Sequence, residues 1–196
     1  MGSEYDPVFG PTQGSVDDLE DVRAVFARAS SPFTRSPWSW WTWAVVLPAV
    51  ALATRPLLAR YGPPAAILAW CSGIILAGIV EMWVVRSGAG SARTTLAGWV
   101  LRSQANLSFV GVAISAALIG FGRAGALPGI WLLILGHSFL MLGGLAFRPF
   151  RRAGWIYQLA GLGALLPGQD GLLWFAAATA LGNLAIGLAV RAQKTI

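Results

Sequence analysis

The side chains of this sequence that could carry chemistry lie inside long apolar segments. His137, the only histidine, stands at the centre of 21 uncharged residues from Leu127 to Phe147. Glu81 is the only acid in a second apolar segment, and Thr179 and Asn183 lie one helical turn apart in a third. Because an ionisable or polar group is costly inside a membrane, each one marks a candidate site for proton transfer or ligand binding.

Each of these side chains also has a structural interpretation, which we expect over the functional one. The imidazole of His137 can bond a backbone carbonyl or the amide of Asn183. Glu81 lies near the end of its segment and can form an ion pair with Arg86 or Arg102. The hydroxyl and amide of the third segment are typical of hydrogen bonds between membrane helices.

The sequence indicates no metal or cofactor site. One histidine and one acid at a different depth do not supply the three protein ligands of a zinc site. The single cysteine, Cys71, excludes an internal disulfide. Ser138 follows His137 directly, so the two side chains point to different faces of a helix. There is no GxSxG, HExxH or glycine-rich phosphate motif, and the sequence therefore argues against an enzyme.

The composition is that of a membrane protein. Hydrophobic residues make up 56% of the 196 residues and charged residues only 11%, whereas a soluble domain carries about 25% charged residues. The net charge of +6 comes from basic residues at the ends of apolar segments, as in membrane proteins. No basic face with stacking aromatic residues is visible, so the expected partner is the lipid bilayer and no nucleic acid.

The polar residues divide the chain into three parts. Residues 1–14 predict a disordered tail, because they are rich in glycine, proline and acids. Residues 15–37 predict an amphipathic surface helix and a linker, with Ser15 as the cap and four acids in the first turns. This helix either lies on the membrane surface or docks a protein partner through residues 15–29. Residues 38–196 predict a transmembrane domain.

Six transmembrane helices are expected in this domain, which makes the predicted fold an all-α polytopic membrane helix bundle. Residues 94–106 are mildly amphipathic, and we expect them to lie at the interface before the third helix. The fifth helix has only 14 residues, so either it extends into the Arg151–Arg152 turn or the bilayer thins around it. The expected helices cover approximately residues 40–60, 65–85, 107–122, 127–147, 153–166 and 172–190.

Four tryptophans gather at the start of the first helix. Tryptophan prefers the headgroup level of a membrane, where its ring contacts both phases. We therefore interpret the group as an interfacial belt, and an aromatic ligand cage is the alternative. The four residues are Trp38, Trp40, Trp41 and Trp43.

Glycines recur every seven residues in the fourth and fifth helices, so each row falls close to one helix face. Small residues allow two membrane helices to approach closely. Because a short loop joins these helices, the rows predict a closely packed antiparallel pair. The rows are Gly129, Gly136 and Gly143 in one helix and Gly154 and Gly161 in the next.

The basic residues predict the orientation of the domain. Three of the fourteen Lys and Arg residues, Arg55, Arg60 and Arg123, fall in the loops of one side, and the other eleven fall in segments of the opposite side. Basic residues concentrate on the cytoplasmic side of membrane proteins. The bias predicts a multi-pass membrane protein with both termini in the cytoplasm.

The C-terminal half contains the stretch GIWLLILGHSFLMLGGLAFRPFRRAGWIYQLAGLGALL and, after a turn, LGNLAIGLAVRAQ. In this pattern it resembles a group of small, uncharacterised bacterial inner-membrane proteins. Those proteins similarly begin with a short polar helix before several membrane spans. The resemblance implies a location in the inner membrane and no particular activity.

The leading functional hypothesis is a non-enzymatic regulatory or accessory membrane subunit that acts by helix association, with a partner protein or as a homo-oligomer. It rests on the glycine rows, the acidic surface helix and the small number of polar groups. The alternative is a small transporter or channel with a path lined by His137, Glu81 and Asn183. An intramembrane enzyme is a third hypothesis.

Overall fold

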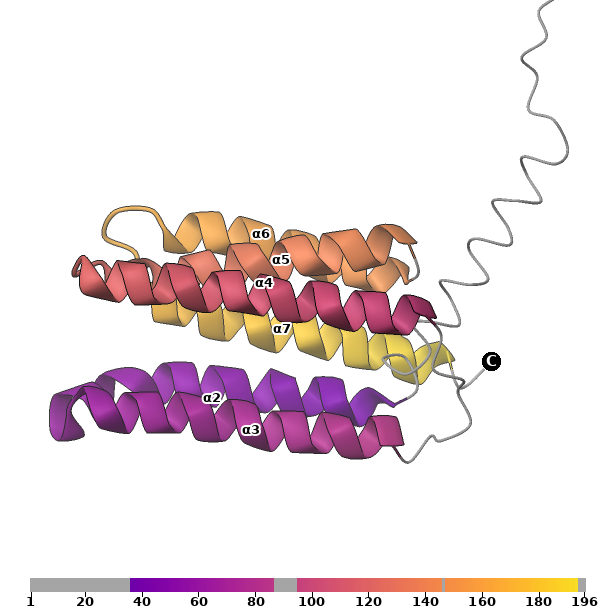
Figure 1. The fold of residues 1–196 in the computed structure, drawn as a ribbon, viewed down its shortest axis with the longest axis horizontal. Helices are drawn as coiled ribbons and strands as arrows, with labels where there is room; N and C mark the ends of the chain where they lie inside the picture. The colour runs from indigo at the N-terminus through magenta and orange to yellow at the C-terminus, as the bar shows by residue number, and fades with distance from the viewer. Residues whose placement is uncertain (1–35, 87–94, 146, 194–196) are drawn as a thin grey trace, which may run out of the picture.

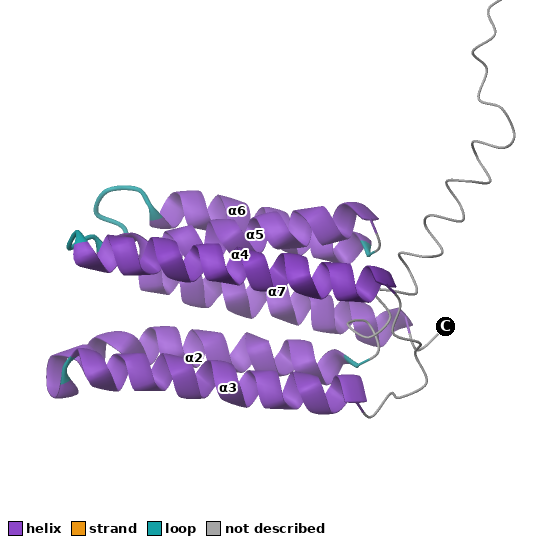
Figure 2. Cartoon of the chain, viewed as in Figure 1, coloured by secondary structure: helices purple, strands orange, loops and turns teal. Residues whose placement is uncertain are grey.

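A computed structural model describes residues 36–86, 95–145 and 147–193 of the chain. These residues form an all-α bundle of long helices that lie side by side (Figure 1 and Figure 2). The predicted tail, residues 1–14, and nearly all of the predicted surface helix and linker, residues 15–37, lie outside the described residues. The helices in chain order are α2 (Pro37–Tyr61), α3 (Pro63–Arg86), α4 (Thr95–Gly120), the short 3-10 helix η1 (Ala124–Ala126), α5 (Leu127–Leu145), α6 (Arg148–Ala164) and α7 (Gly171–Gln193).

Five of the helices, all of the long ones except α6, are long and apolar enough to cross a membrane. The predicted class, an all-α membrane bundle, is therefore confirmed. The 17 residues of α6 rise about 26 Å as a helix, slightly less than the hydrocarbon core of about 30 Å. This helix nevertheless runs back beside α5 (Figure 1), so the described part of the chain passes along the bundle six times.

Successive helices run antiparallel, which gives the bundle two distinct ends. The end where α2 begins is here called the Ser36 end, and the end with the turn between α2 and α3 is called the Gly62 end. Because the chain passes along the bundle an even number of times, the last residue of α7 returns to the Ser36 end (Figure 1). Both ends of the described chain therefore lie on one side of the bundle.

The third helix, which was expected to begin near residue 107 after the interfacial segment 94–106, begins at Thr95 instead. Residues 95–106 are the first part of α4, one continuous helix of 26 residues. The sequence of α4 contains no proline that would end a helix. Its polar residue Gln104 also has a partner inside the bundle, Ser138 of α5, so its polarity does not require the water interface.

The helix expected over residues 153–166 begins earlier, at Arg148, and ends at Ala164. Of the two explanations for its short predicted length, extension into the arginine turn is correct. Pro149 lies in the first turn of α6, where its missing N–H costs no helical hydrogen bond. The arginines of this turn are therefore helical and do not form a loop.

A single residue, Gly62, forms the turn between α2 and α3. Its φ of 77° lies in the left-handed region that glycine adopts without strain, and its N–H donates to the carbonyl of Leu58 at 3.1 Å. Pro63 then begins α3 at once. At the other end of α2, Ser36 caps the helix by accepting from the N–H of Trp38 at 3.4 Å. Local sequence thus sets both ends of α2.

Helix α7 is the centre of the bundle and contacts α2, α5 and α6. Its buried face is rich in small residues, which lets large aromatic side chains of the neighbouring helices lie against its backbone. A Cβ added to Gly182 would lie 3.0 Å from the ring of Tyr157, and one added to Gly187 would meet the ring of Trp41. This close approach provides the dispersion contacts that hold membrane helices together.

The glycine rows of α5 and α6 face each other across a close antiparallel contact. A Cβ added to Gly136 would lie 3.0 Å from the carbonyl oxygen of Gly154, and a Cβ added to Gly154 would lie 3.0 Å from that of Gly136. Gly129 and Gly161 are related in the same way at 3.0 Å. Gly143 lies against the backbone of Arg151. Larger side chains at these positions would force the two backbones apart.

The tryptophan group predicted as a belt divides between surface and core. Trp38 is 63% exposed and stacks edge-on against Trp41, with ring centroids 5.1 Å apart. Trp40 is only 9% exposed and lies 5.3 Å from Phe150 and 5.9 Å from Phe139. Phe139 in turn stacks on Tyr157 at 5.3 Å. The cluster joins α2, α5 and α6 near the Ser36 end, and each pair adds about 0.5–1.5 kcal/mol beyond its buried area.

Candidate functional site

The predicted site residue His137 lies one residue past the middle of α5, and its side chain is exposed on the outside of the bundle. The exposed side chain of Met141 lies one turn further along this helix. The neighbouring Ser138 is buried instead and donates its hydroxyl to the Oε1 of Gln104 in α4 at 2.7 Å. The imidazole is therefore directed to the outer surface, and the hydroxyl is directed to α4.

Glu81 lies between α2 and α3. Its Oε2 accepts a hydrogen bond of 3.1 Å from the indole Nε1 of Trp43. The prediction named Arg86 or Arg102 as the partner, but the side chain of Arg86 lies outside the described residues. The partner that the structure does place on Glu81 is a tryptophan, which the sequence assigned to the interfacial belt. This hydrogen bond joins the two helices of the first hairpin.

Thr179 and Asn183 lie on the buried face of α7, and Asn183 is 3% exposed. Thr179 donates its hydroxyl to the carbonyl of Phe175, one turn earlier in the same helix, at 2.7 Å. The prediction of a bond between helices is therefore wrong for Thr179, because a threonine within a helix can reach the carbonyl four residues back. Near Asn183, the buried Nε1 of Trp41 lies against Gly187 and has no hydrogen-bond partner in the described structure.

The four predicted polar residues do not meet at one place. His137 is on the outer surface of α5, Glu81 is in the contact between α2 and α3, and the pair on α7 is in the core. Within residues 36–86, 95–145 and 147–193, no hydrogen bond or ion pair links any of these three locations. The same ranges contain no group of three His, Cys, Asp or Glu residues placed to hold a metal ion.

Hydrogen bonds between helices involve mostly residues that the sequence analysis did not select. Indole N–H groups donate to hydroxyls in two of them: Trp70 to Thr54 and Trp131 to Ser115, each at 3.0 Å. In a third, the amide of Gln158 in α6 donates to the backbone carbonyl of Leu133 in α5 at 3.1 Å. The sequence feature that could have predicted the Trp70 and Trp131 hydrogen bonds is a tryptophan in one apolar helix and a hydroxyl residue in the preceding one.

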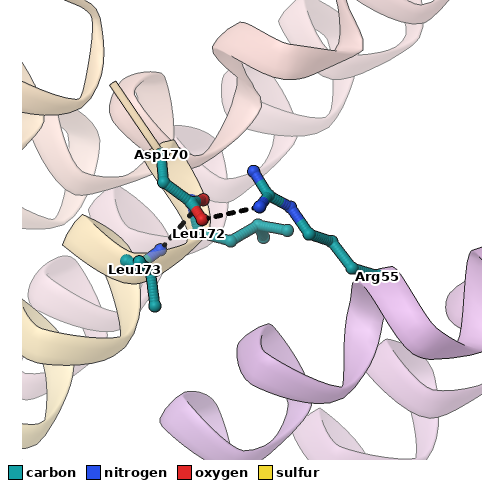
Figure 3. Close-up of polar contacts among 4 residues, drawn as sticks. All are labelled: Arg55, Asp170, Leu172 and Leu173. Carbon is teal, nitrogen blue, oxygen red and sulfur yellow. Dashed lines mark hydrogen bonds and ion pairs between the residues drawn. The ribbon is translucent and has the colours of Figure 1, made fainter. Parts of the chain in front are cut away.

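An ion pair joins α2 to the start of α7 at the Gly62 end of the bundle. Nη1 of Arg55, near the end of α2, lies 2.8 Å from Oδ2 of Asp170, just before α7 (Figure 3). The Oδ1 of the same carboxylate accepts from the backbone N–H groups of Leu172 at 3.1 Å and Leu173 at 3.3 Å. Asp170 is therefore both the N-cap of α7 and the partner of Arg55. Since Arg55 is mostly exposed, the ion pair itself contributes only about 0–1 kcal/mol.

Several described polar side chains form hydrogen bonds between neighbouring helices, and others, such as Thr179, bond within their own helix. His137 takes part in neither kind of bond in the described residues, and it faces outward at the middle of a membrane-spanning helix. The outer face of α5 therefore presents an ionisable side chain at the middle of the helix. A comparison of the chain with protein-family models, curated proteins and solved structures finds no match.

Proposed function

We propose that this chain is a non-enzymatic regulatory or accessory membrane subunit that acts by helix association. The observation that carries the proposal is the outward position of His137 at the middle of α5. The partner is either a second copy of the chain or a different membrane protein, and residues 15–29 offer a further contact for a partner outside the membrane.

The physical argument starts from the hydrogen-bonding needs of imidazole. A neutral imidazole has one donor and one acceptor nitrogen. A polar group placed in hydrocarbon without a hydrogen bond costs about 2–7 kcal/mol, depending on the reference state. Lipid chains cannot bond an imidazole at this depth, but a polar side chain of another helix can. Association at this face would therefore relieve a cost that the isolated chain bears.

The inward polar groups of the same helices support this interpretation. Ser138, next to His137, bonds Gln104, and Glu81 bonds Trp43. These groups have partners within the chain, whereas the outward imidazole of His137 has none in the described residues. Helix α4 also leaves large apolar side chains exposed, including Phe109 at its middle, which gives a partner helix further surface beside α5.

Polymer-bounded membrane discs, extracted without detergent, test this proposal. The number and identity of polypeptides per disc would be measured by native mass spectrometry for the wild type and for H137L. We expect the wild type to carry a second polypeptide in fixed ratio, and H137L to lose most of it. M141L, on the same exposed face, should keep the second polypeptide. One chain per disc in the wild type, or equal occupancy in H137L, contradicts the proposal.

We also place the chain in the inner (plasma) membrane with both termini in the cytoplasm. The support is the charge distribution between the two ends of the bundle. The Ser36 end carries the arginine turn of α6 and Arg191, whereas Arg55, Arg60 and Arg123 lie toward the Gly62 end. Basic residues mark the cytoplasmic side, which would make the Ser36 end cytoplasmic. The transport alternative needs His137, Glu81 and Asn183 to line one path, and their separate positions give it no support.

A further inference from the structure

Along the exposed face of α6, the side chains change from basic to aromatic to aliphatic from the first turn to the last. Three arginines stand in its first turns, a tryptophan follows one turn later, and leucines continue the same face. Apart from two adjacent arginines, successive members are three or four residues apart, so they share one side of the helix. All are exposed, and Trp155, Leu159 and Leu162 are 55%, 63% and 57% exposed. We call this surface the α6 stripe: Arg148, Arg151, Arg152, Trp155, Leu159 and Leu162.

The opposite face of α6 fixes the direction of the stripe. Phe150, Ala153 and Tyr157 are at most 2% exposed and lie in the core. Gly154 and Gly161 bring this face to within backbone contact of α5. Helix α6 therefore cannot rotate to bury its arginines, and the α6 stripe faces away from the bundle.

Helix stability does not explain the three arginines. Positive side chains at the beginning of a helix oppose its dipole, and acids are favoured there instead. No acid stands in the first turn of α6. In the described ranges the acids are Glu81, which bonds Trp43, and Asp170, which pairs with Arg55 at the opposite end of the bundle. The cluster therefore suits an anion from outside the described chain.

The depth of each residue along α6 identifies the chemistry of that anion. The exposed arginines place the first turn of α6 at the headgroup level, because charged side chains avoid the hydrocarbon core. Guanidinium groups bind phosphate oxygens in bidentate fashion. Tryptophan prefers the boundary below the headgroups, and leucine suits acyl chains. The order of basic, aromatic and aliphatic side chains matches the order of parts in a phospholipid.

We propose that the α6 stripe binds an anionic phospholipid. Arg148 and Arg152, one turn apart, hold the phosphate, and Arg151 contributes further positive charge beside it. One acyl chain lies along Trp155, Leu159 and Leu162. A zwitterionic lipid binds less well, because its positive headgroup amine is repelled by three guanidinium groups.

Native mass spectrometry of the full chain, titrated with phosphatidylglycerol and phosphatidylcholine, tests the proposal. The wild type should bind phosphatidylglycerol more tightly. Each basic residue near a membrane surface is worth about 1 kcal/mol, or about fivefold in affinity. R148Q/R152Q should therefore bind phosphatidylglycerol about 25-fold more weakly while its affinity for phosphatidylcholine changes little.

A matched control variant comes from the other end of the bundle. R60Q/R123Q removes the same charge at the Gly62 end and should keep the affinity of the wild type. W155A retains all three arginines and should lose affinity for phosphatidylglycerol but not for inorganic phosphate. If R148Q/R152Q does not fold, R152Q alone should show a loss of about fivefold.

Three results would overturn the proposal. Equal affinity of R148Q/R152Q and the wild type would remove the arginines from the site. An equal loss in R60Q/R123Q would indicate a general effect of net charge. Inorganic phosphate that competes with phosphatidylglycerol as strongly as the lipid itself would indicate a site for free phosphate, with no role for Trp155 and the leucines.

Discussion

At the scale of single residues, the hydrogen bond between Trp43 and Glu81 shows how this chain uses polar groups inside a membrane. The indole N–H of α2 reaches a carboxylate oxygen of α3 at 3.1 Å. Because hydrocarbon holds no water, neither group can form a hydrogen bond with solvent, and each one satisfies the other. From its residue type alone, Glu81 was expected to serve a functional site or to form an ion pair. Its hydrogen bond to Trp43 instead joins the two helices of a hairpin.

We expect the removal of one partner to cost more than the removal of both. E81L leaves the N–H of Trp43 without an acceptor and should lower the free energy of unfolding by about 1–2 kcal/mol. E81Q keeps an acceptor oxygen and should have a smaller effect. W43F/E81L should recover part of the loss, since no unpaired donor remains. Thermal unfolding in lipid nanodiscs, analysed as a double-mutant cycle, measures the coupling.

Additive effects of E81L and W43F in this cycle would contradict the hydrogen bond as a stabilising link. The two substitutions would then act only through the volume that each one removes. The same comparison applied to Trp70 and Thr54, which are 3.0 Å apart, provides a second test within the same hairpin.

At the scale of helices, the pair of α5 and α6 depends on glycine at defined positions. The sequence predicted this contact from the seven-residue spacing alone, because that spacing returns to nearly the same helix face. The three-dimensional structure adds the register: Gly136 faces Gly154, and Gly129 faces Gly161. Which glycines oppose each other depends on where α6 begins, and its first residue, Arg148, comes earlier than predicted.

G136A should destabilise the bundle, because the new Cβ would lie 2.9 Å from the backbone nitrogen of Gln158 and 3.0 Å from the carbonyl oxygen of Gly154. Backbone atoms cannot move aside as a flexible side chain can. Overpacking of this kind costs about 1–3 kcal/mol. The matched control is G78A in α3, where a Cβ would meet no atom within 4 Å and where alanine favours the helix.

Chemical or thermal unfolding in the same lipid would compare the two alanine variants. G136A should melt below the wild type, and G78A should melt at or slightly above it. If both variants were equally stable, α5 and α6 would be further apart than the glycine contact requires.

At the scale of the whole molecule, the parity of the helix count determines where the ends of the chain lie. Five helices are long and apolar enough to cross a membrane, and α6 adds a sixth pass beside α5. With six passes, the first and last described residues share the Ser36 end (Figure 1). If α6 lay flat on the surface, α5 and α7 could not both begin at the Gly62 end.

Cysteine accessibility in sealed vesicles tests this arrangement. In a C71A background, single cysteines at S36C and Q193C should react with a membrane-impermeant thiol reagent from the same side. G125C, in the connection before α5, should react only from the opposite side. Labelling of Q193C and G125C from one side would mean that α6 does not cross the membrane and that the bundle has an odd number of spans.

The sequence by itself determined the class of this protein and most of its helices. Long apolar segments, few charges and basic residues at segment ends predict a membrane bundle. A lipid environment requires this composition whatever contacts the helices make with each other. The glycine spacing predicted the α5–α6 contact for a similar reason: helical periodicity is a local property. Helix boundaries were less accurate, as the first turns of α4 and α6 show.

The tertiary structure decided the role of each polar side chain. His137 and Ser138 are neighbours in sequence, yet one faces outward and the other bonds Gln104. Trp40 belongs to the core although its sequence neighbours suggested a belt. A hydrogen bond between helices depends on the relative rotation and register of two segments far apart in the chain. Those quantities result from the packing of whole helix faces, which no short stretch of sequence specifies.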